Sequence, residues 1–298
     1  MLGIFTRLWM RLILSVLSLS LFLIGSATAD SLRIGVIADC QYCSGPDKGK
    51  RKYALSEKKL QACIDHLNTM DLEYVIHLGD FIDRDFESFA VVGPIYKQLK
   101  APHYHVLGNH DFSVADALKE KVPATMGLSS RYYDFAVDGW RFIVIDGNDV
   151  SFHAYPEGSD AHRAAEKYYE DHELDAPKWN GALGADQMRW LKQSLDKAEE
   201  ANEKVILYCH FPVFPENNHN LWNANEVVTL ISGYRCVKAY INGHNHAGNY
   251  AGFGGVHYLT MQGMVDTTET AYSVLELTDD SITITGFGRE GDRELKLR

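Results

Sequence analysis

The chain has 298 residues, with 29 lysines and arginines against 40 aspartates and glutamates, which gives a formal net charge of −11. This acidic balance argues against general nucleic-acid binding, because such binding needs basic patches that neutralise phosphates. An anionic small molecule would need local positive charge, which a bound metal ion can supply.

The N-terminal segment has the pattern of a secretory signal peptide. Arg7 and Arg11 form a basic region, residues 12–24 are apolar, and small residues at 27–29 fit a signal-peptidase site. The apolar run is shorter than the roughly 20 residues that span a bilayer, which disfavours the alternative of a retained membrane anchor. We predict a cleaved signal peptide at residues 1–29 and a periplasmic or secreted protein with no stable membrane insertion.

Five short apolar runs, each followed at once by polar residues, predict buried strands. Apolar residues at helical spacing predict helices around residues 60–67 and 185–200. Strands that alternate with helices favour parallel pairing in the first half, while a hairpin at 132–146 and a strand-rich tail add antiparallel strands. The sequence thus predicts an α/β fold whose five runs are residues 33–38, 74–78, 103–107, 205–209 and 237–241.

Residues 149–181 differ from the rest of the chain. They are polar, contain Pro156 and Pro177, and have no clear strand pattern. A connection of this length in a compact domain is usually functional. We interpret it as an insertion near the substrate side of a single domain at residues 30–298.

The polar residues that follow the five runs include carboxylates, amides and imidazoles. Carboxyl ends of parallel strands meet at one edge of a sheet, where ligands bind in open α/β folds. One such residue could be a cap or a core hydrogen-bonding group, but five strand ends with such groups favour one common site. We expect convergence of Asp39, Gln41, Asp80, Asn109, His210, His244 and His246.

These residues stand in blocks that resemble the calcineurin-type metallophosphoesterase superfamily. Its blocks are D-x-H, G-D-x-x-D, G-N-H-[DE], a lone His and G-H-x-H. The resemblance implies a β-sandwich of mixed sheets flanked by helices, with a dinuclear metal site at the strand ends. The matching segments are residues 39–41, 79–83, 108–111, His210 and residues 243–246.

The resemblance also implies the ligand sets and the chemistry. A hydroxide between two ions roughly 3.5–4 Å apart would attack phosphorus. His110 would face the phosphate, with Asp111 orienting its ring, while Asp83 would hold a ligand or cap a turn. One metal would take Asp39, Gln41, Asp80 and His246, and the other would take Asp80, Asn109, His210 and His244.

Gln41 stands where most members of the superfamily have histidine. An amide oxygen is harder than an imidazole nitrogen, so this site should favour Mn²⁺ or Mg²⁺ over Zn²⁺, with iron as another alternative. Together with residues 39–42, 180–191, 210–215, 222–223 and 243–250, Gln41 resembles the manganese-dependent ADP-ribose/CDP-alcohol diphosphatases. That resemblance implies hydrolysis of the diphosphate in nucleoside diphosphate conjugates.

Substrate contacts are harder to assign from the sequence. Phe211, Trp222 and Tyr250 are candidates for stacking on a base, although core or rim packing is the alternative for each. Arg84 could meet a phosphate oxygen or could simply be solvated. Asp83 occupies the place where purple acid phosphatases need a tyrosine ligand, which disfavours that group.

Other functions and pairings remain open at this point. The same metal cluster would serve a broader phosphomonoesterase or phosphodiesterase, including a protein phosphatase, or a non-catalytic metal-dependent binding protein. Cys40 and Cys43 could form a small disulfide or remain thiols. Nothing in the sequence sets the oligomeric state.

Overall fold

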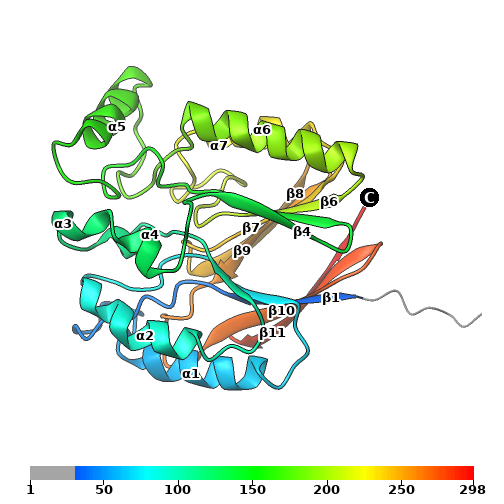
Figure 1. Ribbon diagram of the computed structural model, residues 1–298, viewed down its shortest axis with the longest axis horizontal. Coiled ribbons are helices and arrows are strands. Elements are labelled where there is room, and N and C mark those ends of the chain that lie inside the picture. Colours follow the sequence, from blue (N-terminus) through cyan, green and yellow to red (C-terminus); the bar gives the residue numbers. More distant parts are fainter. Residues whose placement is uncertain (1–30) are drawn as a thin grey trace, which may run out of the picture. The chain divides into compact units, whose positions relative to one another are not determined.

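The computed structural model describes residues 31–298, so the predicted signal peptide lies outside the described residues. Two six-stranded mixed sheets stack against each other, and helices cover the outer face of each sheet (Figure 1). This is the predicted sandwich of mixed sheets flanked by helices. Among residues 31–298, no helix has both the length and the apolar character needed to cross a bilayer.

The first sheet joins the N-terminal strands to the C-terminal ones. β1, β2 and β3 pair in parallel, as the sequence predicts, and β10, β11 and β12 extend the sheet in antiparallel fashion from β1. In spatial order the strands are β12 (Arg293–Lys296), β11 (Ser281–Gly288), β10 (Ala271–Leu277), β1 (Leu32–Ile37), β2 (Tyr74–His77) and β3 (His103–His105).

The second sheet comes from the middle of the chain. β5, β6, β7 and β9 run parallel, while β4 and β8 lie antiparallel at its two edges. The predicted hairpin is present as β4 and β5. In spatial order the strands are β4 (Tyr133–Val137), β5 (Trp140–Val144), β6 (Lys204–Tyr208), β7 (Val237–Asn242), β9 (Val256–Gln262) and β8 (Ala247–Phe253).

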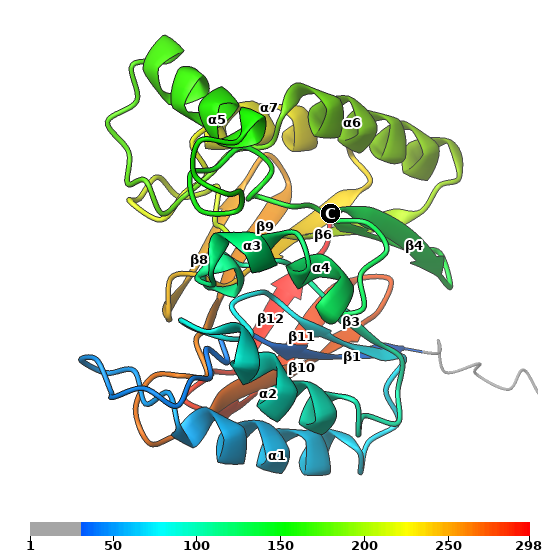
Figure 2. The ribbon, with the colours of Figure 1, turned by 60° about the vertical axis from the view of Figure 1, so that its left-hand side comes forward.

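The helices follow the two sheets. α1 (Leu55–Leu67) and α2 (Phe89–Tyr96) lie beside each other against the first sheet, and α6 (Ala185–Glu200) and α7 (Ala224–Ser232) lie against the second (Figures 1 and 2). The sequence pattern at 185–200 predicts α6 with its observed bounds. The shorter helices are α3 (Asp116–Lys119), α4 (Val122–Thr125) and α5 (Asp160–Asp171), with 3₁₀ turns at Phe86–Ser88 and His110–Phe112.

Residues 149–181 contain a helix that the sequence reading missed. α5 begins after Ser159, whose hydroxyl accepts the backbone N–H of His162 at 3.2 Å. Only Ala165 is buried along the helix, so no apolar stripe reveals it in the sequence. The serine cap is the one local signal that could have indicated it.

Strand β1 is buried on both faces, which explains its continuous apolar run. Ile34 and Val36 pack between the two sheets with Phe142 of β5 and Tyr208 of β6, whereas Ile37 packs outward against α1. Each fully buried aliphatic side chain contributes roughly 1.5–3 kcal/mol. The polar residues that follow β1 are therefore held at the end of a rigid strand.

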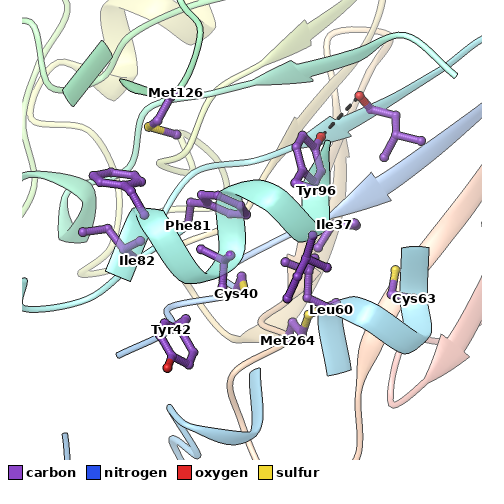
Figure 3. Packing of buried hydrophobic residues seen from close by; sticks show 14 of the residues in the cluster. Ile37, Cys40, Tyr42, Leu60, Cys63, Phe81, Ile82, Tyr96, Met126 and Met264 are labelled. Carbon is purple, nitrogen blue, oxygen red and sulfur yellow. Dashed lines mark hydrogen bonds between the residues drawn. The ribbon is translucent and has the colours of Figure 1, made fainter. Parts of the chain in front are cut away.

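The outer cluster beneath α1 and α2 contains Ile37, Leu60, Cys63, Phe81 and Tyr96 (Figure 3). Leu60 and Cys63 belong to the apolar stripe that predicts α1.

All five cysteines are free thiols, and both Cys40 and Cys43 are buried. The sequence leaves their pairing open, and the structure places no disulfide between them.

Two buried histidines lie in this cluster. The ring of His105 lies 4.9 Å from Phe81 and 4.5 Å from Tyr96 between ring centroids, and His77 lies beside it. Burial and the neighbouring His103 lower the pKa of His105 from 6.5 to about 3. Burial likewise holds the pKa of His77 well below its usual range. Both imidazoles are therefore neutral in the folded protein.

We expect this arrangement to make the fold sensitive to acid. Between pH 6.5 and about 3 the unfolded chain binds a proton that the folded His105 does not, so stability falls as the pH drops below about 6.5. For one such group the loss at pH 5 is about 2 kcal/mol. Urea denaturation at pH 7.5 and pH 5 should show a smaller difference for His105→Phe than for the wild type. The exposed His172→Gln should keep the wild-type difference, and an unchanged difference in His105→Phe would exclude His105 as the cause.

Candidate metal centre

Both sheets send polar side chains to one place. Asp39 and Gln41 follow β1, Asp80 follows β2 and Asn109 follows β3, all in the first sheet. From the second sheet, His210 follows β6, while His244 and His246 lie between β7 and β8. All seven side chains are buried, and the structure brings together every ligand candidate named from the sequence.

The backbone at this site is locally unusual. Asp39, Gln41, Asp80 and His244 have positive φ angles of 52°, 45°, 56° and 67°. Left-handed conformations cost non-glycine residues roughly 1–3 kcal/mol and cluster at functional sites. They turn the chain sharply after β1, β2 and β7, where these four residues stand.

The glycines of the sequence blocks allow close packing of these turns. A Cβ atom at Gly79 would lie 2.7 Å from the Gly108 backbone nitrogen and 2.8 Å from His210 Nδ1. A Cβ atom at Gly108 would collide with the backbone nitrogen and carboxylate of Asp80. The glycines therefore allow the loops after β2, β3 and β6 to pack closely against one another.

A first group of acceptor atoms lies around Nε2 of His210. Its Nδ1 lies 2.9 Å from the Leu78 carbonyl oxygen and donates there, so in the neutral ring Nε2 is the acceptor. That Nε2 lies 3.2 Å from Asp80 Oδ2, 3.2 Å from Asn109 Oδ1 and 3.1 Å from His244 Nδ1. The Nε2 of His244 faces Asn180 Oδ1 at 3.0 Å, so its Nδ1 is also a bare acceptor. Converging acceptors of this kind fit a cation.

A second group shares Asp80 with the first. His246 Nδ1 donates to Asp266 Oδ1 at 3.0 Å, which leaves its Nε2 facing Asp39 Oδ1 at 3.4 Å. Gln41 Nε2 donates to Asp80 Oδ2 at 2.7 Å, and the buried Gln41 Oε1 has no hydrogen-bond partner among residues 31–298. A buried amide oxygen without a donor is costly, and a metal ion would satisfy it.

The charges of the site point the same way. Burial opposes a charge on His210 and His246, yet the adjacent carboxylates of Asp80 and Asp39 raise the pKa of each imidazole to about 9. The two carboxylates thus favour positive charge beside them, which either protons or metal ions can supply. The residues present therefore fit a pair of divalent cations.

His110 lies beside the cluster, and its partner differs from the sequence expectation. Its Nδ1 donates to Asp83 Oδ1 at 2.8 Å, so Asp83 orients the ring. Asp111, predicted for that role, instead accepts backbone N–H groups of Gly108, Asp80, Phe81 and Ile82 at 2.7–3.2 Å. Both carboxylate oxygens of Asp111 are thus occupied by backbone groups of the loops after β2 and β3, so its role is to hold these two loops together.

The cluster opens into a cavity of about 590 Å³. Three ligand candidates line it, Asp80, Asn109 and His244, together with His110. Part of its lining comes from residues 149–181, through His153, Lys178 and Trp179. The other lining residues are Lys48, Arg51, Ser113 and His219.

The four substrate contacts proposed from the sequence lie elsewhere. Phe211 is fully buried, with its ring centroid 4.7 Å from that of His244, so it packs behind the site and offers no face to a base. Trp222 packs against Phe152, Tyr168 and Tyr169 beside a neighbouring polar cavity.

Tyr250 and Arg84 also lie away from the cavity lining. Tyr250 is 40% exposed and stacks on His257 of β9. Arg84 lies over the ring of Tyr53 at 4.4 Å and donates to the Pro46 carbonyl oxygen. In this structure, neither side chain lines the cavity above the metal cluster.

The sequence reading gave no role to several residues that the structure places at the site. Asn180 and Asp266 hold the outer nitrogens of His244 and His246. Arg51 lies beside His110. Asn180 falls in a segment that resembles the diphosphatases, whereas nothing in the sequence marks Asp266 or Arg51.

We expect Asp266→Asn to weaken metal binding, because Asp266 fixes the tautomer and raises the basicity of His246. Loss of such a partner typically costs 10- to 100-fold in affinity. Titration of chelated protein with Mn²⁺, followed by calorimetry, would measure the change. Asp292→Asn, a carboxylate on the loop before β12, should leave the affinity unchanged, and equal affinity in both variants would contradict the role of Asp266.

Comparison with known proteins agrees with this geometry. A family model described as calcineurin-like phosphoesterase matches residues 32–248. Proteins named manganese-dependent ADP-ribose/CDP-alcohol diphosphatase from Oryza sativa subsp. japonica, Arabidopsis thaliana and Homo sapiens are 27%, 29% and 27% identical. The alignments cover 88%, 89% and 89% of this chain and 92%, 97% and 92% of the relatives.

Solved structures share the fold. A dimetal phosphatase from Danio rerio superposes with a TM-score of 0.81 at 22% identity, over 90% of this chain and 99% of that chain. A purple acid phosphatase from yellow lupin reaches 0.56 at 12% identity, over 90% of this chain and 54% of that chain. Since the family model spans most of the described residues, the chain belongs to the calcineurin-like phosphoesterase family, a family of hydrolases.

Proposed function

We propose that the protein is a metal-dependent diphosphatase that cleaves the diphosphate bond of nucleoside diphosphate conjugates of the ADP-ribose or CDP-alcohol type. One observation carries the metal dependence: two ligand groups overlap at Asp80. Asp39, Asp80 and His246 form one group, and Asp80, His210 and His244 form the other, with the ligand atoms of each group within 4.8 Å of one another. The names of the relatives support the substrate class.

The proposed ligand sets follow the two groups. Gln41 Oε1 completes the first group and Asn109 Oδ1 completes the second. Oxygen ligands favour harder ions, and the relatives are named manganese-dependent, so we propose two Mn²⁺ ions. In such a site a metal pair supplies activation of water and neutralisation of phosphate charge.

The protein's own groups then position the reaction. His110 faces the cavity with Nε2, because its Nδ1 is held by Asp83. From there Nε2, which carries no proton in the neutral ring, can take one up and hold it against a phosphate or leaving oxygen. The His110 backbone N–H donates to Asp80 Oδ1 at 2.7 Å, which ties this residue to the shared ligand. Asp111 keeps both loops in place through its four backbone contacts.

The test is product identification with chelated, metal-reconstituted protein. We expect Mn²⁺ to restore hydrolysis of ADP-ribose to AMP and ribose 5-phosphate, or of CDP-choline to CMP and phosphocholine. Turnover of an aryl phosphate but of neither conjugate would replace the proposal with a broader phosphoesterase. Metal binding without turnover of any phosphoester would leave only a binding protein.

We also propose that the protein is exported, and this proposal rests on the sequence pattern of residues 1–29 alone. Fractionation of cells that express the full chain should place the protein outside the cytoplasm. Recovery of a full-length cytoplasmic protein would contradict it.

A further inference from the structure

Arg51 is a guanidinium at the metal cavity whose role the metal cluster does not explain. It lies between β1 and α1 and lines the cavity with Asp80, Asn109 and His110. Its Nη1 lies 3.4 Å from His110 Nε2. Because His110 Nδ1 donates to Asp83, Nε2 is the acceptor of this contact, and the guanidinium faces the place where substrate must lie.

The backbone holds Arg51 in that position. Arg51 N–H donates to the Lys48 carbonyl at 3.0 Å, and Lys48 N–H donates back at 3.3 Å. Arg51 also forms a β-bridge with Asp266, and Lys52 N–H donates to the Val265 carbonyl at 2.9 Å. The loop that orients His246 therefore also fixes Arg51, so the guanidinium is preorganised relative to the metal cluster.

Within residues 31–298, the surroundings of Arg51 give it no carboxylate partner. Among residues 31–298 no carboxylate oxygen lies within 4 Å of its guanidinium nitrogens. Burial lowers the pKa of Arg51, but the side chain of Tyr53 and the more distant charges of Asp80 and Asp83 outweigh burial and raise it. Half-burial of an unpaired cation costs free energy that a bound anion would recover. Lys48 and Lys178 also line the cavity but are exposed, where solvent weakens their attraction.

We propose that Arg51 binds the second, non-reacting phosphate of the substrate and so makes the site selective for a P–O–P bond over a simple phosphoester; this rests on the proposed diphosphatase function. Its planar fork can hold two oxygens of one phosphate. In the reaction, water oxygen bonds to one phosphorus and the bridging oxygen departs with the electron pair on the other phosphate. The proton released from water goes to solvent, and Arg51 balances the charge of the departing phosphate.

The test compares two substrates in Arg51→Gln, Arg51→Lys and the exposed control Arg189→Gln. For ADP-ribose, Arg51→Gln should lower kcat/KM by roughly 100-fold or more, the usual effect of losing a charge-stabilising donor. For bis(p-nitrophenyl) phosphate, which has one phosphate, the change should stay below about threefold. Arg51→Lys should recover part of the loss, since it keeps the charge but not the fork. Arg189→Gln should match the wild type on both.

Equal losses on both substrates, or no loss on ADP-ribose, would overturn the role of Arg51. The metal content and melting temperature of each variant distinguish a loss of phosphate binding from misfolding. If the wild type hydrolyses the aryl diester but no nucleotide conjugate, the diphosphatase proposal fails. Inhibition of diester hydrolysis then tests separately whether Arg51 binds a second phosphate. The α,β-methylene analogue of ADP should inhibit the wild type more strongly than AMP does, and Arg51→Gln should lose that difference; its persistence would exclude Arg51 as the second-phosphate site.

Discussion

Asp80→Asn is expected to abolish most activity and to lower bound metal below two ions per chain. Asp80 Oδ2 lies 3.2 Å from His210 Nε2, and the carboxylate belongs to both ligand groups. The amide is nearly isosteric but removes the negative charge that two cations would share. A metal pair contributes several kcal/mol to transition-state stabilisation, and each 1.36 kcal/mol is a factor of ten, so kcat/KM should fall by roughly 10³-fold or more.

Metal analysis of the purified variant and steady-state kinetics with added Mn²⁺ would check this result. Asp134→Asn is a matched control, because Asp134 pairs with Arg141 in the β4–β5 hairpin at 2.8 Å and touches no metal candidate. It should retain two ions and wild-type turnover. Full metal content and activity in Asp80→Asn would disprove the shared-ligand assignment.

His110→Ala is expected to lose turnover while keeping metal. Loss of a positioned acid or base typically costs 10²- to 10⁴-fold. The contact of this residue to Asp80 uses its backbone N–H, which alanine retains, so the ligand orientation should survive. Measurement of kcat alongside metal content separates the two effects, and loss of metal in His110→Ala would show that the imidazole is itself a ligand.

The two neighbouring aspartates should then behave differently. Asp83→Asn should lower kcat with little change in stability, because it weakens only the orientation and charge support of the His110 ring. Asp111→Asn should mainly destabilise the fold, since an amide offers a single acceptor to the four N–H groups that Asp111 now satisfies. The reverse pattern would restore the expectation from the sequence that Asp111 orients His110.

The strands and the ligand candidates were predictable because they depend on local pattern. β1, β2, β6 and β7 are buried on both faces, so their apolar runs are continuous, and the chain turns directly after each run. Ligand candidates lie within a few residues of these strand ends, where parallel pairing brings them together. The order of the sequence blocks then identifies the metal-binding type.

The supporting contacts were not predictable, because they depend on how distant loops meet. Asp83 and Asp111 each follow a ligand candidate closely, and only the three-dimensional turn decides which one reaches His110. Asp266 lies outside the sequence blocks that contain the ligand candidates, on the loop after β9. Phe211 directly follows His210 in a bend after β6, and the bend directs its side chain into the core instead of the cavity.

The sequence of residues 149–181 indicates neither its helix α5 nor its position at the cavity. A helix with one buried residue leaves no periodic signal, and Trp179 and Lys178 line the cavity from an irregular stretch. The wall of the site above the metal cluster is thus the part about which the sequence says least.

The division of the ligands between two sheets has a consequence for the lifetime of the protein. Cations held by Asp39 of the first sheet and His246 of the second would act as cross-links between the two sheets. At a free metal concentration 1,000 times the dissociation constant, one such site adds about 4 kcal/mol to the stability of the fold. A medium poor in manganese would therefore shorten the survival of the protein against proteases as well as slow its reaction.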